Sequence, residues 1–136
     1  MIVGVSALAL VFLVSGCGDS PDSVMKDQIK ASNEVLDVLE GIKTKEDAEK
    51  AKAKLEDLDK KFKDVIEREK KIKVSKDQEK KLQEKYKDDL ERVEKRMMAA
   101  ALKLAGNPDS VQILKPALEK IKKTVEEAQK SILAGK

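Results

Sequence analysis

Apolar residues recur at spacings of three and four along most of the chain after residue 23, which predicts amphipathic helices. The pattern is clearest from residue 44 to about residue 73, where the expected inward positions are Ala48, Ala51, Leu55, Leu58, Phe62 and Val65. It recurs over 23–41, over 75–106 and from 108 to the C-terminal end. The sequence therefore predicts an all-α protein of four helices.

Capping boxes mark the starts of the second and third predicted helices. Thr44 is followed three residues later by Asp47, and Ser75 is followed three residues later by Gln78. At this spacing each side chain can bond the backbone N–H of the other. The second helix is therefore expected to end near residue 73, in a tight turn between antiparallel helices.

The other helix ends depend on serine, proline and glycine. Ser20 with Pro21, or Ser23 in their place, is expected to open the first helix. Gly106 is expected to close the third in a left-handed conformation. Pro116 does not disturb the apolar phase of the fourth helix, so a bent helix is favoured over a break just before this proline.

The apolar stripes predict how the helices pack. The expected inward positions are Leu82, Tyr86, Leu90, Val93, Met97, Ala100 and Leu104 in the third helix, and Val111, Leu114, Leu118, Ile121, Val125, Ala128 and Ile132 in the fourth. Short connections favour an antiparallel up-down-up-down bundle with coiled-coil-like packing. The alternative is a long coiled coil of the second and third helices, with the other two loosely attached.

Charge and composition argue against most kinds of chemistry. The 29 basic and 26 acidic residues are interleaved, which is unlike the one-signed face of a nucleic-acid binder. The chain has no histidine, and its one cysteine is the expected site of lipid attachment, so the usual general base and the soft metal ligands are missing. Asp88 and Asp89 are neighbours on a helix and point about 100° apart, so they cannot form a catalytic dyad. We expect no enzymatic activity, no metal site, no cofactor and no small-molecule substrate.

The single cysteine follows an uncharged apolar segment. Residues 2–14 have the length of a signal-peptide core and are shorter than the roughly 20 residues of a spanning helix. The sequence Val14-Ser15-Gly16-Cys17, preceded by Leu13, resembles the lipobox of bacterial lipoproteins. The resemblance implies cleavage between Gly16 and Cys17, a diacylated Cys17 thiol, and a fatty acid such as palmitate on the new amino group.

This resemblance divides the chain into a signal peptide over 1–16, a lipidated N-terminus and tether over 17–22, and a helical domain over 23–136. It implies a membrane-anchored protein of the bacterial cell envelope. The C-terminal Lys136 also resembles the lysine that joins murein lipoproteins to peptidoglycan. Four antiparallel helices, however, would return this lysine to the membrane end, away from the wall.

Two segments are candidates for interaction surfaces. Around Met97, Met98, Ala101 and Leu102 the third helix is apolar nearly all round. We favour burial of these residues in the core, at the end of the bundle where Leu36, Leu39, Met97, Leu104, Val111 and Leu114 are expected to meet. Methionine-rich helices can instead serve as adaptable partner surfaces.

The second candidate is the basic turn between the second and third helices, formed by Arg68, Lys70, Lys71, Lys73, Lys76, Lys80 and Lys81. It is either a solvated hairpin tip or a contact for anionic lipid. The function that the sequence favours is a lipid-anchored, non-enzymatic module that presents a surface to another envelope protein. The alternative is a structural envelope protein that self-associates as a homo-oligomer or touches the cell wall.

Overall fold

A capping box opens each of the first three helices in the computed structural model, which describes residues 20–72 and 74–134, with side chains up to residue 127. Ser20 caps α1 (Pro21–Glu40), Thr44 caps α2 (Lys45–Glu69) and Ser75 caps α3 (Lys76–Lys85). The boxes predicted at Thr44 and Ser75 are confirmed. Because the cap of α1 is Ser20, this helix includes Pro21 and Asp22, which the sequence analysis assigned to the tether.

The described part of the chain is all-helical, but it has five helices and not the predicted four. The segment predicted as one helix over 75–106 is divided into α3 and α4 (Lys87–Ala105) at Tyr86, whose φ of −103° and ψ of 9° are not helical. The ring of Tyr86 is buried with Leu82 and Met25, and its hydroxyl donates to Asp22 Oδ1 at 2.8 Å. These contacts with the start of α1 account for the bend, which the unbroken apolar phase could not reveal.

The last helix, α5 (Pro108–Ala134), runs through Pro116 without a break, as the favoured prediction required. The prediction for Gly106 is wrong, because this residue has a right-handed conformation with φ of −76°. Asn107 N–H bonds the carbonyl of Leu104 at 2.8 Å, and Asn107 Oδ1 accepts from the N–H of Ser110 at 3.2 Å. Asn107 thus closes one helix and opens the next, so no left-handed glycine is required.

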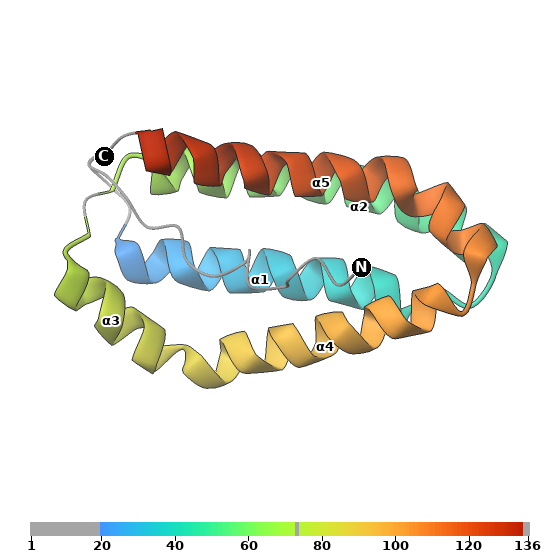
Figure 1. The fold of residues 1–136 in the computed structure, drawn as a ribbon, viewed down its shortest axis with the longest axis horizontal. Coiled ribbons are helices and arrows are strands. Elements are labelled where there is room, and N and C mark those ends of the chain that lie inside the picture. Colours follow the sequence, from blue (N-terminus) through green and yellow to red (C-terminus); the bar gives the residue numbers. More distant parts are fainter. Residues whose placement is uncertain (1–19, 73, 135–136) are drawn as a thin grey trace.

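The four long helices, α1, α2, α4 and α5, alternate in direction, but they are not packed in chain order (Figure 1). The most extensive interface joins α5 to α2, followed by those of α1 with α2 and with α4. Two pairs of neighbours, α2 with α5 and α1 with α4, therefore run in the same direction. The alternative architecture, a long coiled coil of the second and third predicted helices, is not seen, because α1 and α5 are the main neighbours of α2.

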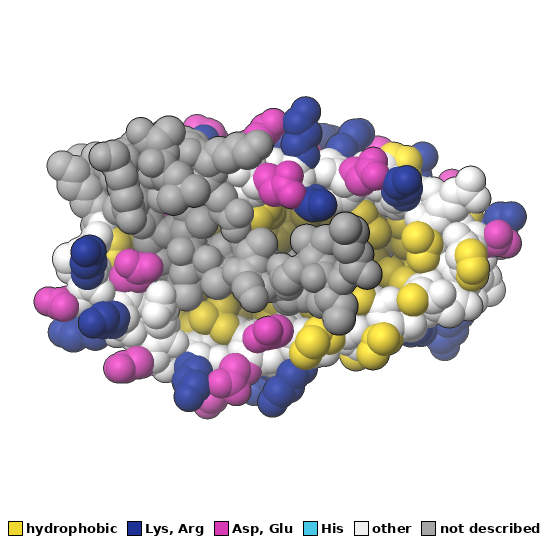
Figure 2. Space-filling view, in the orientation of Figure 1, with side chains coloured by type: hydrophobic (Ala, Val, Ile, Leu, Met, Phe, Trp, Pro, Cys, Tyr) yellow, Lys and Arg dark blue, Asp and Glu magenta, His cyan; other side chains and the backbone are white. Residues whose placement is uncertain are grey.

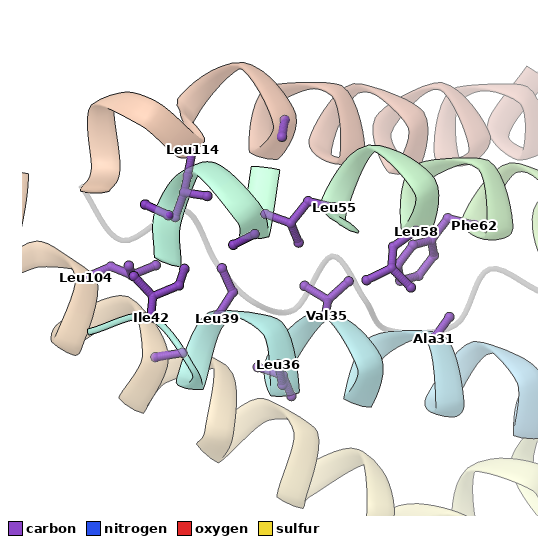
Figure 3. Packing of buried hydrophobic residues seen from close by; sticks show 14 of the residues in the cluster. Ala31, Val35, Leu36, Leu39, Ile42, Leu55, Leu58, Phe62, Leu104 and Leu114 are labelled. Atoms are coloured by element: carbon purple, nitrogen blue, oxygen red, sulfur yellow. The ribbon is translucent and has the colours of Figure 1, made fainter. Parts of the chain in front are cut away.

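The main core lies between the four long helices and includes Leu36, Leu55, Leu104 and Leu114 (Figure 3). Six residues were expected to meet at the end of the bundle that includes the apolar part of α4. Of these, Leu36, Leu39, Leu104 and Leu114 are buried in the main core, and Met97 packs against it. The prediction for Val111 is wrong, because its side chain is 37% exposed.

The buried stripe of α5 is shifted from the predicted one. Ser110, Ala117 and Thr124 are buried at intervals of seven residues, with Leu114 buried between the first two. Small side chains at this repeat allow two helices to approach closely. Apart from Leu114, the buried residues of α5 thus lie one position before the predicted ones, in a helix that packs mainly against α2. Val111 follows Ser110 directly, so its side chain points about 100° away from the buried stripe.

Candidate functional site

The end of α4 next to α5 carries exposed apolar side chains. Met98 is 47% exposed and Leu102 is 77% exposed, and Ala101 is exposed beside them. We call Met98, Ala101 and Leu102 the α4 patch. Figure 2 shows hydrophobic side chains gathered at this end of the molecule. The favoured prediction of burial is therefore wrong for these three residues, whereas Met97 packs partly buried against the core.

The α4 patch exists because this part of α4 is apolar on two faces. Val93, Met97, Ala100 and Leu104 form the inward stripe, at spacings of four, three and four. Met98, Ala101 and Leu102 follow a second stripe with the same helical spacing, on the side away from the core. Since an α-helix in a bundle buries only one stripe, the second one remains in contact with solvent.

The basic turn lies at the other pole, where α1 begins and α2 ends (Figure 1). Two of its members are engaged: Arg68 Nη1 lies 2.7 Å from Asp27 Oδ2, and Lys70 Nζ lies 3.0 Å from Glu67 Oε1. The other described members of this turn, Lys71, Lys76, Lys80 and Lys81, are exposed and form no ion pair with another described residue. Lys73, Gly16 and Cys17 lie outside the described residues.

Glu69 is a buried acid at this pole that is not among the site residues predicted from the sequence. Its side chain is 4% exposed, and its Oε1 atom has no hydrogen-bond partner among the described residues. Burial raises the pKa of Glu69 to about 8, because removal from water disfavours the charged form. The pattern does indicate the burial, since Glu69 lies one turn beyond Val65 on the same stripe of α2.

Arg96 forms a polar clamp between α1 and α4. Its guanidinium donates to both carboxylate oxygens of Glu40 at 2.9 and 2.8 Å, to Asn33 Oδ1 at 2.7 Å and to Asp37 Oδ1 at 2.7 Å. Hydrogen bonds with Glu40 and Asp37 raise the pKa of Arg96 further above its ordinary value. Asn33, Asp37 and Glu40 are spaced four and three residues apart, so the sequence places them on one face, but it does not identify their partner.

A buried polar contact joins α2 to α5. Thr124 Oγ1 donates to Asp59 Oδ1 at 2.6 Å, and Lys63 Nζ lies 2.8 Å from Asp59 Oδ2. Burial disfavours the charged form of Asp59, but the bonds from Lys63 and Thr124 outweigh it and lower the pKa below its ordinary value. No sequence signal separates Asp59 from the other acids of this helix. The contact positions the two helices against each other.

A shallow groove on the outside of α1 and α2, of about 440 Å³, is lined by charges of both signs. Ion pairs of Lys61 with Glu34 and of Arg68 with Asp27 cross it. Within the described residues, no cluster of three or more His, Cys, Asp or Glu side chains could hold a metal ion. None of the described helices is long and apolar enough to span a membrane.

The fold and these surfaces define a class: a helical bundle with an exposed apolar patch at one pole and exposed lysines at the other. Comparison with known family models, curated protein sequences and solved structures gives no match for this chain.

Proposed function

We propose that the protein is a lipid-anchored, non-enzymatic lipoprotein of the bacterial envelope that presents the α4 patch to another protein. The observation that carries the proposal is the exposure of three neighbouring apolar side chains, Met98, Ala101 and Leu102, on a helix whose other face is already buried. Single exposed apolar residues are ordinary, but a stripe at helical spacing is typical of a surface that packs against a second apolar element. The expected partner offers an apolar helix or groove.

The position of the α4 patch supports this proposal. The chain leads back towards Cys17 from the pole at which α1 begins, and the α4 patch lies towards the opposite pole (Figure 1). Because α1 has 20 residues and a helix rises about 1.5 Å per residue, the two poles are about 30 Å apart. An anchor at Cys17 would hold the α4 patch well away from the membrane, where a partner could reach it.

Substitution of Cys17 by serine tests the anchor. Cys17→Ser is expected to abolish incorporation of labelled fatty acid and to release the protein from the membrane fraction or stall it as a precursor. Acylation of cysteine supplies the two or more chains that stable attachment requires. The matched control is Ser15→Ala, which leaves the cysteine in place and should still be labelled. Fatty acid that still enters the Cys17→Ser protein would refute the assignment.

Crosslinking from the α4 patch tests the interaction. A photoreactive residue at Leu102 is expected to give one discrete product with a different protein in intact cells, whereas the same residue at Lys54, on the outside of α2, should give none. A product of twice the chain mass, together with a dimer or larger species in sedimentation of residues 18–136, would support the structural, self-associating alternative. Equal products from both positions would contradict both readings.

A further inference from the structure

We propose that the pole at which α1 begins is a contact surface for the phosphate headgroups of anionic lipids, formed by Lys71, Lys76, Lys80 and Lys81. We call these four residues the lysine quartet. The proposal deepens the proposed function and rests on it, because the anchor at Cys17 is what would turn this pole towards the membrane.

Several acids around this pole are engaged in internal contacts. Asp22 Oδ1 accepts hydrogen bonds from Lys85 and Tyr86, and Asp22 Oδ2 lies 3.2 Å from Lys26. The bond from Lys85, followed by that from Tyr86, lowers the pKa of Asp22 to about 2, so this acid stays ionised and engaged.

Three further acids near this pole do not form ion pairs with the lysine quartet. Asp27 is paired with Arg68, and Glu67 is paired with Lys70. Glu69 is buried and protonated at neutral pH, so it contributes no negative charge. The internal contacts therefore leave the lysine quartet less neutralised than the sequence alone suggests.

The quartet itself is free to meet an external anion. All four side chains are exposed, and none forms an ion pair with another described residue. Asp77, Glu79 and Glu84 lie in α3 with Lys76, Lys80 and Lys81, so the positive excess is modest. The expected binding is therefore weak and sensitive to salt, as for other attractions between lysines and a charged bilayer.

The distance to the proposed anchor favours lipid as the occupant. The first described residue, Ser20, is three positions after Cys17, and a fully extended chain covers at most about 3.6 Å per residue. An acylated Cys17 would thus hold the start of α1 within about 11 Å of the bilayer surface. This is close to the screening length of about 10 Å at 0.1 M salt, so the pole at which α1 begins, to which the lysine quartet belongs, would face the field of the headgroups.

Vesicle sedimentation tests the proposal without the anchor. The chain from Gly18 to Lys136 keeps every described residue, and the three apolar clusters consist of residues between 24 and 121. We expect it to bind phosphatidylcholine vesicles containing about 30% phosphatidylglycerol at about 20 mM salt, and at least fivefold less at about 300 mM. Pure phosphatidylcholine vesicles should not bind it. No binding to the anionic vesicles at low salt would overturn the proposal.

Two sets of substitutions separate a local surface from net charge. Replacement of Lys71, Lys76, Lys80 and Lys81 by glutamate should reduce binding about tenfold or more. Replacement of Lys30, Lys43, Lys54 and Lys95, which are exposed, without an ion pair to any described residue and outside the quartet, changes the net charge equally and should leave binding within about twofold. Equal losses in both sets would overturn the proposal.

Circular dichroism checks that the variants fold, and glutamine at the quartet positions provides a second variant if glutamate lowers helicity. The glutamine variant should also lose binding, and unchanged binding would contradict the proposal. The hypotheses of the lipid anchor and of the lysine quartet can be refuted independently of each other. Fatty-acid labelling of Cys17 without vesicle binding would overturn only the lipid contact, and vesicle binding without labelling would overturn only the anchor.

Discussion

Leu104→Ala is expected to lower the free energy of unfolding by about 2–5 kcal/mol, whereas Leu102→Ala should change it by less than about 0.5 kcal/mol. The two leucines are two residues apart on α4, so the change in helix propensity is the same for both. They differ in burial: Leu104 is 9% exposed within the main core and Leu102 is 77% exposed. Only the first substitution leaves a cavity.

Urea unfolding followed by circular dichroism measures both values. Lys87→Ala, on the exposed face of α4, is a second control and should be close to neutral. Equal destabilisation by the two leucine variants would mean that Leu102 is buried in solution, by a second copy or by repacking. That result would also remove the basis for the α4 patch.

Glu69→Gln is expected to stabilise the protein at neutral pH, by about 3 kcal/mol at pH 7. Burial raises the pKa of Glu69 to about 8, while in the unfolded chain its pKa is near the ordinary value of 4.5. Between these two values the folded protein keeps a proton that the unfolded chain loses, so unfolding is favoured as the pH rises. The contribution of protonated Glu69 to the free energy of unfolding is fully present below about pH 4.5, and it is lost as the pH rises through about 8. Glutamine is neutral at every pH and avoids this loss.

The measurement is the free energy of unfolding of both proteins from pH 5 to pH 8. The difference between Glu69→Gln and the unmodified protein should widen steadily over this range. Glu67→Gln is the matched control, because Glu67 is exposed and, among the described residues, pairs with Lys70, and its difference should stay within about 1 kcal/mol. Parallel curves for Glu69→Gln and the unmodified protein would show that Glu69 is hydrated in the fold.

The sequence by itself determined the helical segments and most of their starts. Capping boxes at Thr44 and Ser75 are local, since each joins atoms three residues apart, and they form as predicted. The apolar stripe of α2 is likewise a property of one helix, and its six predicted inward positions are all buried. Helix formation and the inward face depend on neighbouring residues, so the order of residue types is enough to find them.

Only the tertiary structure decided which helices pack together and which apolar residues stay outside. The pairing of α2 with α5 involves the small residues Ser110 and Ala117 and the bond of Thr124 to Asp59, a contact between positions 65 residues apart. The division at Tyr86 depends on Asp22, 64 positions away. The two apolar stripes of α4, one with Leu104 and one with Leu102, look equivalent in the sequence. Because they lie on different sides of the helix, burial of the first leaves the second exposed. Such choices depend on the size and polarity of side chains from distant segments, which periodicity along a single helix does not contain.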